Sequence, residues 1–376
     1  MLKTIFIIIG LILLTSCNKF DEILHVNDVS MHSSNLTYKS GVPLLLTKPE
    51  QLQTIGVNMY SFVTVNEWFD QDTILYLSDE SGISYIYKFD ILTGEEEVFF
   101  QINEPILHLE ANPDNSIFTI EVATINGQKE LYFINKTGEV LHKLEGIGDE
   151  FHLYWNPYKE NELVIAVLQE DYSMKMLNFN LRSKSLTNFD FDYYYLQWIA
   201  EEEMAYLKWD SFSLSYYAPL FSYNKRTDRE MKIADDVIAF FGYRDFFLTI
   251  STADSTLQKS NYLFYHSESK KELENLQVPI LNTYSGQWWI PNHDFHTPSR
   301  TFYLIKPNTS GDVFDYPDGY KIVSFQIETG ITKEIISIDT NYPIKLSPDG
   351  RWLLFGYQLE NIIDINNREI HSLLYW

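Results

Sequence analysis

The chain has 376 residues and a formal net charge of −24, with 52 acidic against 28 basic side chains. A surface this acidic repels phosphate groups, so we expect no nucleic-acid partner and no membrane attachment through a basic patch. Aromatic residues make up 16% of the chain, including 26 Tyr and 25 Phe, which favours half-buried β-strands. The single cysteine, Cys17, excludes an internal disulfide and any site built from several cysteines.

The N-terminus reads as an export signal. A short basic start precedes an apolar run from Thr4 to Leu14, which has the length of a signal-peptide core and is too short to span a bilayer comfortably. Leu14-Thr15-Ser16-Cys17 then resembles the bacterial lipobox. The resemblance implies that cleavage follows Ser16 and that Cys17 carries a diacylglycerol thioether. An ordinary secretory signal with a chance cysteine is the alternative.

We therefore expect a lipoprotein signal peptide over residues 1–16. Residues 17–40 follow no clear period and are interpreted as the lipidated N-terminus and a flexible tether. Two or more acyl chains hold a protein durably on a bilayer. The expected location is the bacterial cell membrane, lipid-anchored and facing outside the cytoplasm. Which membrane of a two-membrane envelope would hold the anchor stays open.

The remainder of the chain, residues 41–376, repeats one turn about every forty-four residues. Its clearest copy, Ser347-Pro348-Asp349-Gly350, is a β-turn, because Pro fixes φ at the first central position and Gly ends the turn. The other expected copies are 68–70, 112–115, 155–158, 198–201, 242–245 and 289–292.

A second marker is a tight hairpin rich in Asn, Asp and Gly, residues that supply the positive φ such turns need. The expected copies are 90–94, 135–138, 180–184, 224–227, 267–270, 327–330 and 364–367. Strand-length apolar runs lie between the two markers, as in Leu163–Leu168.

Two markers in one register predict an all-β fold, a β-propeller of four-stranded antiparallel blades. We count seven units, of which the sixth carries an insertion around Lys306 to Tyr320. The segment Gly41–Lys48 could add a strand to the closing blade, since propellers close their ring by such pairing.

The turn Ser347–Gly350 and the hairpin Asp90–Gly94 resemble TolB-type propeller repeats. Lipobox, tether and propeller together resemble the YqgU-like β-propeller lipoproteins, and this resemblance covers nearly all of the mature chain. It implies a six-bladed ring, which differs from our count of seven and leaves the first or last unit open. It implies no site residues.

Three tryptophans, Trp155, Trp198 and Trp289, each stand two residues before the register position of their repeats. This places them near the ends of inner strands, where large aromatic side chains commonly fill the wedge between blades. The functional alternative is an aromatic rim at one mouth of the central channel, which would stack on a sugar or a peptide. Trp155, Trp198 and Trp289 are therefore the candidate ligand-binding residues.

No catalytic set, metal site or cofactor is predicted. His293-Asp294-Phe295-His296 would need a third ligand to hold zinc, and is interpreted as a polar loop. Asp312, Asp315 and Asp318 lack the alternate spacing of an EF-hand loop, although calcium tolerates irregular oxygen cages. Ser267-Glu268-Ser269-Lys270 matches a penicillin-binding motif in letters only, because it sits in a hairpin rather than on a helix.

The leading hypothesis is a lipid-anchored extracytoplasmic propeller that serves as a binding or scaffold module for a protein, peptide or glycan at the cell envelope, and is not an enzyme. The main alternative is a propeller enzyme, a lyase or a metal-assisted hydrolase, with its site at the channel mouth. That alternative requires His and acidic residues from several blades to converge. An outer-membrane assembly factor ranks third, because its repeats carry a Trp after the Asp-x-x-Thr-Gly turn that is missing here.

Overall fold

The computed structural model describes residues 51–375, except 57, 59, 149, 170, 172, 211–214, 253–257 and 283–287. All of them belong to one unit, Glu50–Trp376. The predicted signal peptide, Cys17, the tether and the predicted strand within Gly41–Lys48 lie outside the described residues. No helix among the residues described is long and apolar enough to cross a membrane.

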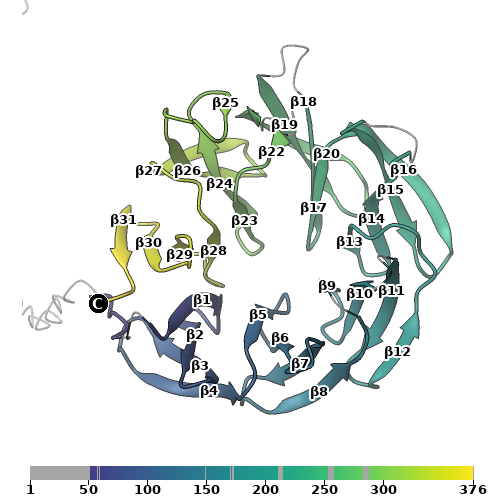
Figure 1. Ribbon diagram of the computed structural model, residues 1–376. Helices are drawn as coiled ribbons and strands as arrows, with labels where there is room; N and C mark the ends of the chain where they lie inside the picture. The colour runs from purple at the N-terminus through teal and green to yellow at the C-terminus, as the bar shows by residue number, and fades with distance from the viewer. Residues whose placement is uncertain are drawn as a thin grey trace, which may run out of the picture. The chain divides into compact units, whose positions relative to one another are not determined.

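The described residues form a ring of seven four-stranded antiparallel sheets, which confirms the predicted all-β propeller and the count of seven (Figure 1). Each sheet is one blade, made of consecutive strands with the first strand innermost. Blade 1 comprises β1 (Phe62–Trp68), β2 (Thr73–Glu80), β3 (Ile83–Asp90) and β4 (Glu96–Ile102). Blade 2 comprises β5 (Ile106–Ala111), β6 (Ile117–Ala123), β7 (Lys129–Asn135) and β8 (Val140–Glu145). Blade 3 comprises β9 (Glu150–Trp155), β10 (Glu162–Leu168), β11 (Met174–Asn180) and β12 (Ser185–Asn188). Blades 4 and 5 comprise β13 (Leu196–Ala200), β14 (Glu203–Leu207), β15 (Ala218–Asn224), β16 (Arg229–Val237); and β17 (Ala239–Tyr243), β18 (Phe246–Thr252), β19 (Lys259–His266), β20 (Glu272–Pro279). Blades 6 and 7 comprise β23 (His293–His296), β24 (Thr301–Pro307), β26 (Tyr320–Gln326), β27 (Ile331–Ile338); and β28 (Ile344–Leu346), β29 (Trp352–Phe355), β30 (Asn361–Asp364), β31 (Glu369–Ser372).

Side-chain caps explain why the turns recur. In the hairpin between β3 and β4, the Asp90 carboxylate accepts the N–H groups of Leu92 and Thr93 at 2.9 and 2.8 Å, and Gly94 takes a φ of 75°. In the turn between β28 and β29, the Ser347 hydroxyl accepts the N–H of Trp352 at 2.9 Å. All seven predicted hairpins lie between the third and fourth strands of a blade, as expected.

The sixth blade corrects one register assignment. The turn after its inner strand β23 spans Thr297 to Arg300, and Trp289–Asn292 precedes that strand. The cause is an extra three-stranded sheet of β21 (Leu281–Asn282), β22 (Trp288–Trp289) and β25 (Gly311–Asp312), whose Trp-Ile-Pro-Asn stretch imitates the repeat. The predicted insertion around Lys306 to Tyr320 is confirmed, since β25 lies in the loop between β24 and β26.

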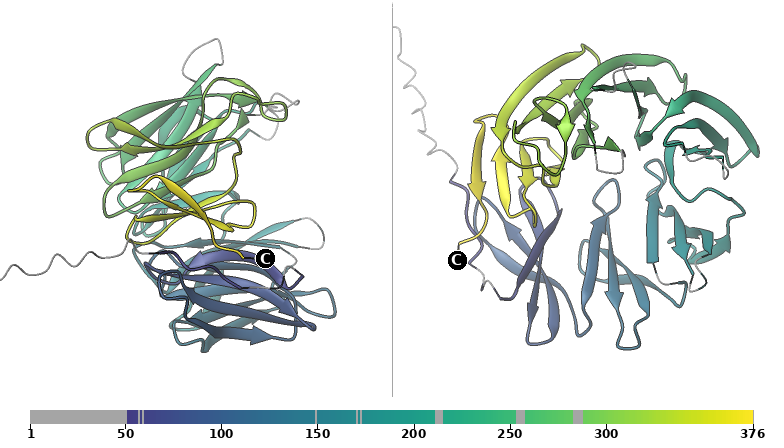
Figure 2. Two further views of the ribbon diagram at one scale, coloured as in Figure 1. Left: turned by 90° about the vertical axis from the view of Figure 1, so that its left-hand side faces the viewer. Right: turned by 45° about the horizontal axis from the view of Figure 1, so that its top comes forward.

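Each of the seven blade interfaces holds one hydrophobic cluster, so the core forms a ring of wedges rather than a single block. The ring closes where blade 7 packs against blade 1, with Trp68 and Trp352 in the shared cluster. Gln358 accepts the N–H of Val65 through its carbonyl at 3.0 Å, and Ile55 pairs with Leu374 as a parallel bridge. Figure 2 shows the last blade, in yellow, beside the first, in purple.

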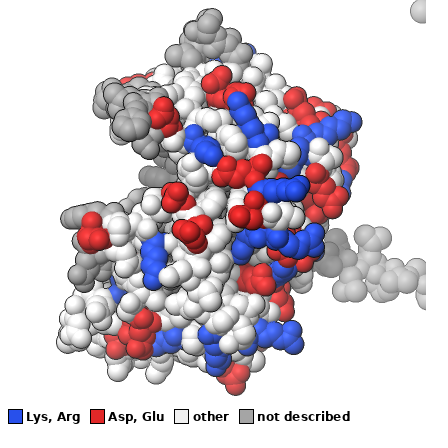
Figure 3. All heavy atoms as spheres, turned by 90° about the vertical axis from the view of Figure 1, so that its right-hand side faces the viewer, with Lys and Arg blue, Asp and Glu red and all other residues white. Residues whose placement is uncertain are grey.

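The acidic surface is partly compensated locally. On the side of the ring formed by blades 3 to 5, acidic side chains lie among lysines and arginines rather than in one field (Figure 3). Lys159 contacts Glu202 at 2.5 Å, and Lys208 contacts Glu230 at 2.8 Å. Exposed pairs of this kind contribute little to stability, about 0 to 1 kcal/mol each.

Candidate functional site

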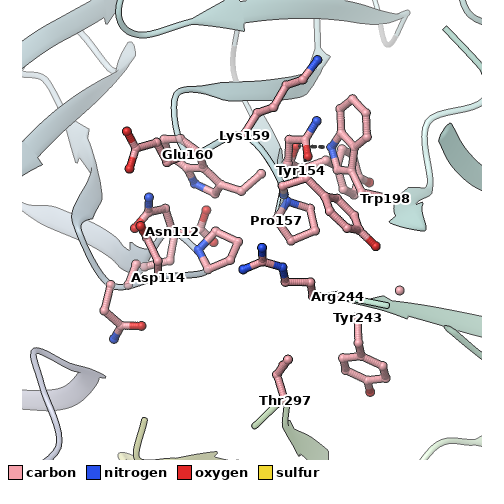
Figure 4. A pocket seen from close by; sticks show the side chains of 18 of the residues that line it. Asn112, Asp114, Tyr154, Pro157, Lys159, Glu160, Trp198, Tyr243, Arg244 and Thr297 are labelled. Atoms are coloured by element: carbon pink, nitrogen blue, oxygen red, sulfur yellow. Dashed lines mark hydrogen bonds between the residues drawn. The ribbon is translucent and has the colours of Figure 1, made fainter. Parts of the chain in front are cut away.

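A cavity of about 1240 Å³ opens at the ends of the inner strands, on the face that carries the turns between first and second strands. Its wall comes from all seven blades, from the ends of their inner strands and from turns that follow them (Figure 4). The volume exceeds that of most drug-sized pockets, about 300–1,000 Å³. This cavity is the candidate functional site.

Indole nitrogens tie neighbouring inner strands together at two interfaces around the cavity. Trp68 of β1 donates its Nε1–H to the Lys345 carbonyl of blade 7 at 3.1 Å. Trp198 of β13 donates in the same way to the Tyr154 carbonyl of blade 3 at 2.8 Å, as the dashed line in Figure 4 marks. In both cases the accepting carbonyl belongs to the preceding blade and lies three residues before that blade's turn proline, Pro348 or Pro157.

Carboxylates make a second kind of tie. Each of them reaches from its own inner strand to the next blade, whereas the indoles reach to the preceding blade. Glu67 of β1 accepts the backbone N–H of Ala111 in β5 at 3.0 Å. Asp294 of β23 accepts the N–H of Leu346 in β28 at 2.7 Å. A buried carboxylate that receives N–H donors from its own strand and the next blade fixes the spacing of two inner strands.

Charge is concentrated where blades 6, 7, 1 and 2 meet. Lys345 lies 2.5 Å from Glu67, whose side chain is only 7% exposed. Burial alone would lower the pKa of the Lys345 ammonium, but the neighbouring Glu67 carboxylate raises it. Burial raises the pKa of the Asp294 carboxyl, and the hydrogen bonds from Leu346 and Phe295 oppose that rise. This part of the wall is a satisfied ionic network.

Two interfaces lack such ties. Among the residues described, no hydrogen bond joins the strands of blade 2 to those of blade 3, or the strands of blade 5 to those of blade 6. Both are held by hydrophobic clusters and ring contacts, such as Phe133 against Trp155 with centroids 6.0 Å apart. We call them the 2/3 seam and the 5/6 seam.

The seams divide the ring into a four-blade sector, blades 6, 7, 1 and 2, and a three-blade sector, blades 3 to 5. Among the inner strands, close backbone approaches join β1 to β5, β23 to β28, and β13 to both β9 and β17, all within sectors. Across the 5/6 seam, the outer strand β20 approaches β24. Blades 7 and 1 are joined by the hydrogen bonds of Trp68 and Gln358. The cavity lies between the two sectors, which supply opposite parts of its wall.

Each seam carries buried polar atoms without a hydrogen-bond partner. At the 2/3 seam these are Glu110 Oε1 of β5 and Trp155 Nε1 of β9. At the 5/6 seam the atom is the Tyr243 hydroxyl of β17, whose pKa burial and the nearby Asp294 carboxylate raise well above its usual value. Such atoms are rare in folded proteins and call for a reason, because an unpaired buried group costs about 1–3 kcal/mol.

Arg244 lies at the mouth of the cavity, in the turn after β17 (Figure 4). Its guanidinium stands 5.9 Å from the centroid of the Tyr158 ring. The Tyr158 hydroxyl receives the Asp245 N–H at 3.0 Å, so the turn of blade 5 is tied directly to that of blade 3. Gly242 permits this approach, because a Cβ there would lie 2.4 Å from the Trp198 carbonyl oxygen.

The three predicted tryptophans have different environments. Trp155 ends the inner strand β9 and Trp198 lies within the inner strand β13; both line the cavity, with residue exposures of 8% and 4%. Trp198 also carries the Lys225 ammonium 5.1 Å from its ring centroid. Trp289 is not at an equivalent point, since it pairs with Leu281 in the extra sheet and packs between blades 6 and 7. Ligand binding by these residues stays a prediction.

The other motifs have structural roles in the residues described. His293–His296 is the inner strand of blade 6, not the expected polar loop, and His293 packs against Phe241 with ring centroids 4.3 Å apart. Asp312 caps the N–H of Phe314 at 2.9 Å. Lys270 donates to the carbonyl of Ser267 at 2.5 Å within its hairpin. No group of three or more His, Cys, Asp or Glu in the described part of the chain could hold a metal ion.

Sequence reasoning missed Glu67, Glu110, Lys345 and Arg244. For Glu67 and Glu110 the one signal in the sequence is position, because each stands one residue before the end of an inner strand. Acidic residues are common in a chain with 52 of them, so this signal alone distinguishes nothing.

Comparisons with known proteins agree with the architecture. The family model described as a YqgU-like 6-bladed beta propeller domain matches residues 90–356. The uncharacterized lipoprotein YqgU of Bacillus subtilis (strain 168) is 21% identical over 307 residues, which cover 82% of this chain and 83% of that protein. The uncharacterized protein lmo1340 of Listeria monocytogenes EGD-e superposes with a TM-score of 0.78 at 18% identity, over 86% of this chain and 98% of that one. The β-propeller domain of the Trilobed protease from Pyrococcus furiosus, described as having an open velcro topology, gives a TM-score of 0.56 at 10% identity, over 84% and 98% of the two chains. The family description specifies six blades, whereas the described residues of this chain form seven four-stranded sheets.

Proposed function

We propose that this chain, which belongs to the YqgU-like β-propeller family, is a lipid-anchored extracytoplasmic module that binds an envelope partner in the cavity at its inner-strand ends. The partner is a protein, peptide or glycan segment. The observation that carries the proposal is the cavity itself, about 1240 Å³ and walled by two sectors. Among the described residues, no hydrogen bond joins the blade strands of one sector to those of the other.

The wall of the cavity supports binding rather than packing alone. Buried polar atoms are usually paired in folded proteins, but three in this wall, Glu110 Oε1, Trp155 Nε1 and the Tyr243 hydroxyl, are unpaired. The Arg244 guanidinium adds an exposed group at the mouth, suited to a carboxylate or a carbonyl. A ligand that supplies the missing hydrogen-bond partners would remove the free-energy cost of leaving these buried atoms unpaired.

The anchor rests on Cys17 and on the resemblance to a relative named a lipoprotein. With Cys17→Ser, we expect the protein to leave the membrane fraction and to lose metabolic labelling by a fatty-acid analogue. A Cys17→Ser protein that stays in the membrane fraction after a salt wash would contradict the lipid anchor.

The binding site is tested by photocrosslinking in intact cells. A photoreactive amino acid replaces Asp114, which lines the cavity and is exposed, or Val98 on the outer strand β4, which is 48% exposed. We expect a discrete crosslinked species from position 114 and none from position 98. The same species from both positions, or none from position 114, would overturn the proposed site.

A further inference from the structure

The 2/3 seam lacks two contacts that recur at other interfaces. Where blade 1 meets blade 2, the Glu67 carboxylate accepts the N–H of Ala111, two residues before Pro113. At the 2/3 seam Glu110 stands where that carboxylate is expected, next to Trp155, which is two residues before Pro157. Glu110 Oε1 nevertheless accepts no hydrogen bond.

The indole tie is missing from the same seam. Trp68 and Trp198 donate to the carbonyl three residues before the turn of the preceding blade, and the corresponding carbonyl for Trp155 is that of Glu110. Trp155 Nε1 has no acceptor. Glu110 and Trp155 both line the cavity, and they hold a strong acceptor and a donor, both buried and without partners, on the two sides of one seam.

A ligand can reach this pair from the cavity. The Glu110 side chain is 30% exposed, and its other oxygen lies 3.5 Å from His108 Nε2. The unpaired Glu110 Oε1 and Trp155 Nε1 are both closed to a water-sized probe, so access to them requires a small opening of the seam. Such opening breaks no hydrogen bond between strands of the two blades, because none joins the described residues there.

The two free groups define the chemistry of a ligand. A carboxylate that is partly withdrawn from water is best paired with a cationic donor, and an indole N–H needs an acceptor such as a carbonyl. We propose that the 2/3 seam is a subsite for the N-terminal residue of a peptide. The ammonium donates to Glu110 and the carbonyl of the same residue accepts the Nε1–H of Trp155. This subsite rests on the proposed binding function and names its ligand class.

A sugar hydroxyl could both donate and accept, but it would leave the Glu110 charge uncompensated. The other two wall carboxylates that lie on inner strands do not compete for the amine. Glu67 is paired with Lys345 at 2.5 Å, and Asp294 accepts the N–H groups of Phe295 and Leu346 at 2.7 Å each. Glu110 is thus the carboxylate with an uncommitted oxygen at the depth of the inner strands.

The test uses the full lipidated chain in detergent, labelled with 5-fluorotryptophan and observed by fluorine NMR. The probes are tetra-alanine amide with a free amino terminus and the same peptide with an acetylated terminus. The Trp155 resonance is assigned by its loss in Trp155→Phe. We expect the free-amine peptide to shift that resonance with an affinity at least about tenfold higher than the acetylated peptide, as a charge-assisted hydrogen bond requires.

Glu110→Gln should remove the preference for the free amine, whereas Glu160→Gln, a cavity carboxylate away from the seam, should retain it. Equal affinity for the two peptides, no binding of either, or an unchanged preference in Glu110→Gln would overturn the subsite. If crosslinking from position 114 still captures a partner in that case, the binding function stands and only the ligand class falls. If crosslinking also fails, both fall.

Discussion

The interface between blades 1 and 2 and the seam between blades 2 and 3 carry the same residue type at the same place, but only the first is hydrogen-bonded. Glu67 is 5% exposed and contacts Lys345, Ala111 and its own strand. Glu110 contacts only His108 among the described residues, at 3.5 Å. The contrast teaches that a repeat position fixes where a side chain lies, while the packing of the two blades decides whether that side chain forms a hydrogen bond across their interface.

The largest expected effect separates Glu67 from Glu110. Glu67→Gln leaves the Lys345 ammonium without its carboxylate, which should lower the free energy of unfolding by about 2–3 kcal/mol. Glu110→Gln should change it by less than about 0.5 kcal/mol, because the contact it weakens is a long one of 3.5 Å to His108, whose side chain is 60% exposed. Urea denaturation of both variants measures the difference, and equal losses would remove the distinction between interface and seam.

Gly242→Ala should cost about 1–2 kcal/mol, since its Cβ would lie 2.4 Å from the Trp198 carbonyl and force β17 away from β13. Gly56→Ala is the matched control, because nothing lies within 4 Å of a Cβ there. Thermal unfolding should show a lower Tm for Gly242→Ala alone. An unchanged Tm would mean that blades 4 and 5 are not tightly joined.

Trp198→Phe and Trp155→Phe remove the same indole at a tied interface and at a seam. Trp198→Phe also leaves the Tyr154 carbonyl without its donor at 2.8 Å. We expect Trp198→Phe to be less stable than Trp155→Phe by about 1 kcal/mol, as measured by urea denaturation. The reverse order would show that Trp155 has a structural partner.

The smallest expected effect concerns His108. The Glu110 carboxylate accepts a hydrogen bond from the imidazole and raises the pKa of His108, although burial opposes this rise. The contribution to stability is therefore fully present below about pH 6.5 and is lost as the pH rises through the raised pKa. NMR titration should show the His108 pKa falling in Glu110→Gln. A pKa that does not change would contradict the contact.

Much of the fold could be predicted because it depends on local turn chemistry. Asp90, Gly94 and Ser347 cap turns with their own side chains or backbone, and the sequence displays those residues directly. The predicted register of the sixth unit was wrong, because the inserted sheet contains a stretch, Trp289 to Asn292, that resembles the repeated turn.

The site could not be predicted in the same way. Trp155 and Trp198 precede their register positions identically, yet one indole is tied to the preceding blade and the other is not. That difference arises from how far apart two whole blades stand, which depends on the packing of clusters from eight strands. No local pattern encodes it.

The division into two sectors is tested most directly by spin-label distances between equivalent hairpins. Labels at Thr93→Cys and Thr137→Cys span the interface between blades 1 and 2, and labels at Thr137→Cys and Ser183→Cys span the 2/3 seam, all in a Cys17→Ser background. A two-sector ring predicts a narrow distance distribution for the first pair and a broader one for the second. Equally narrow distributions for both pairs would contradict it.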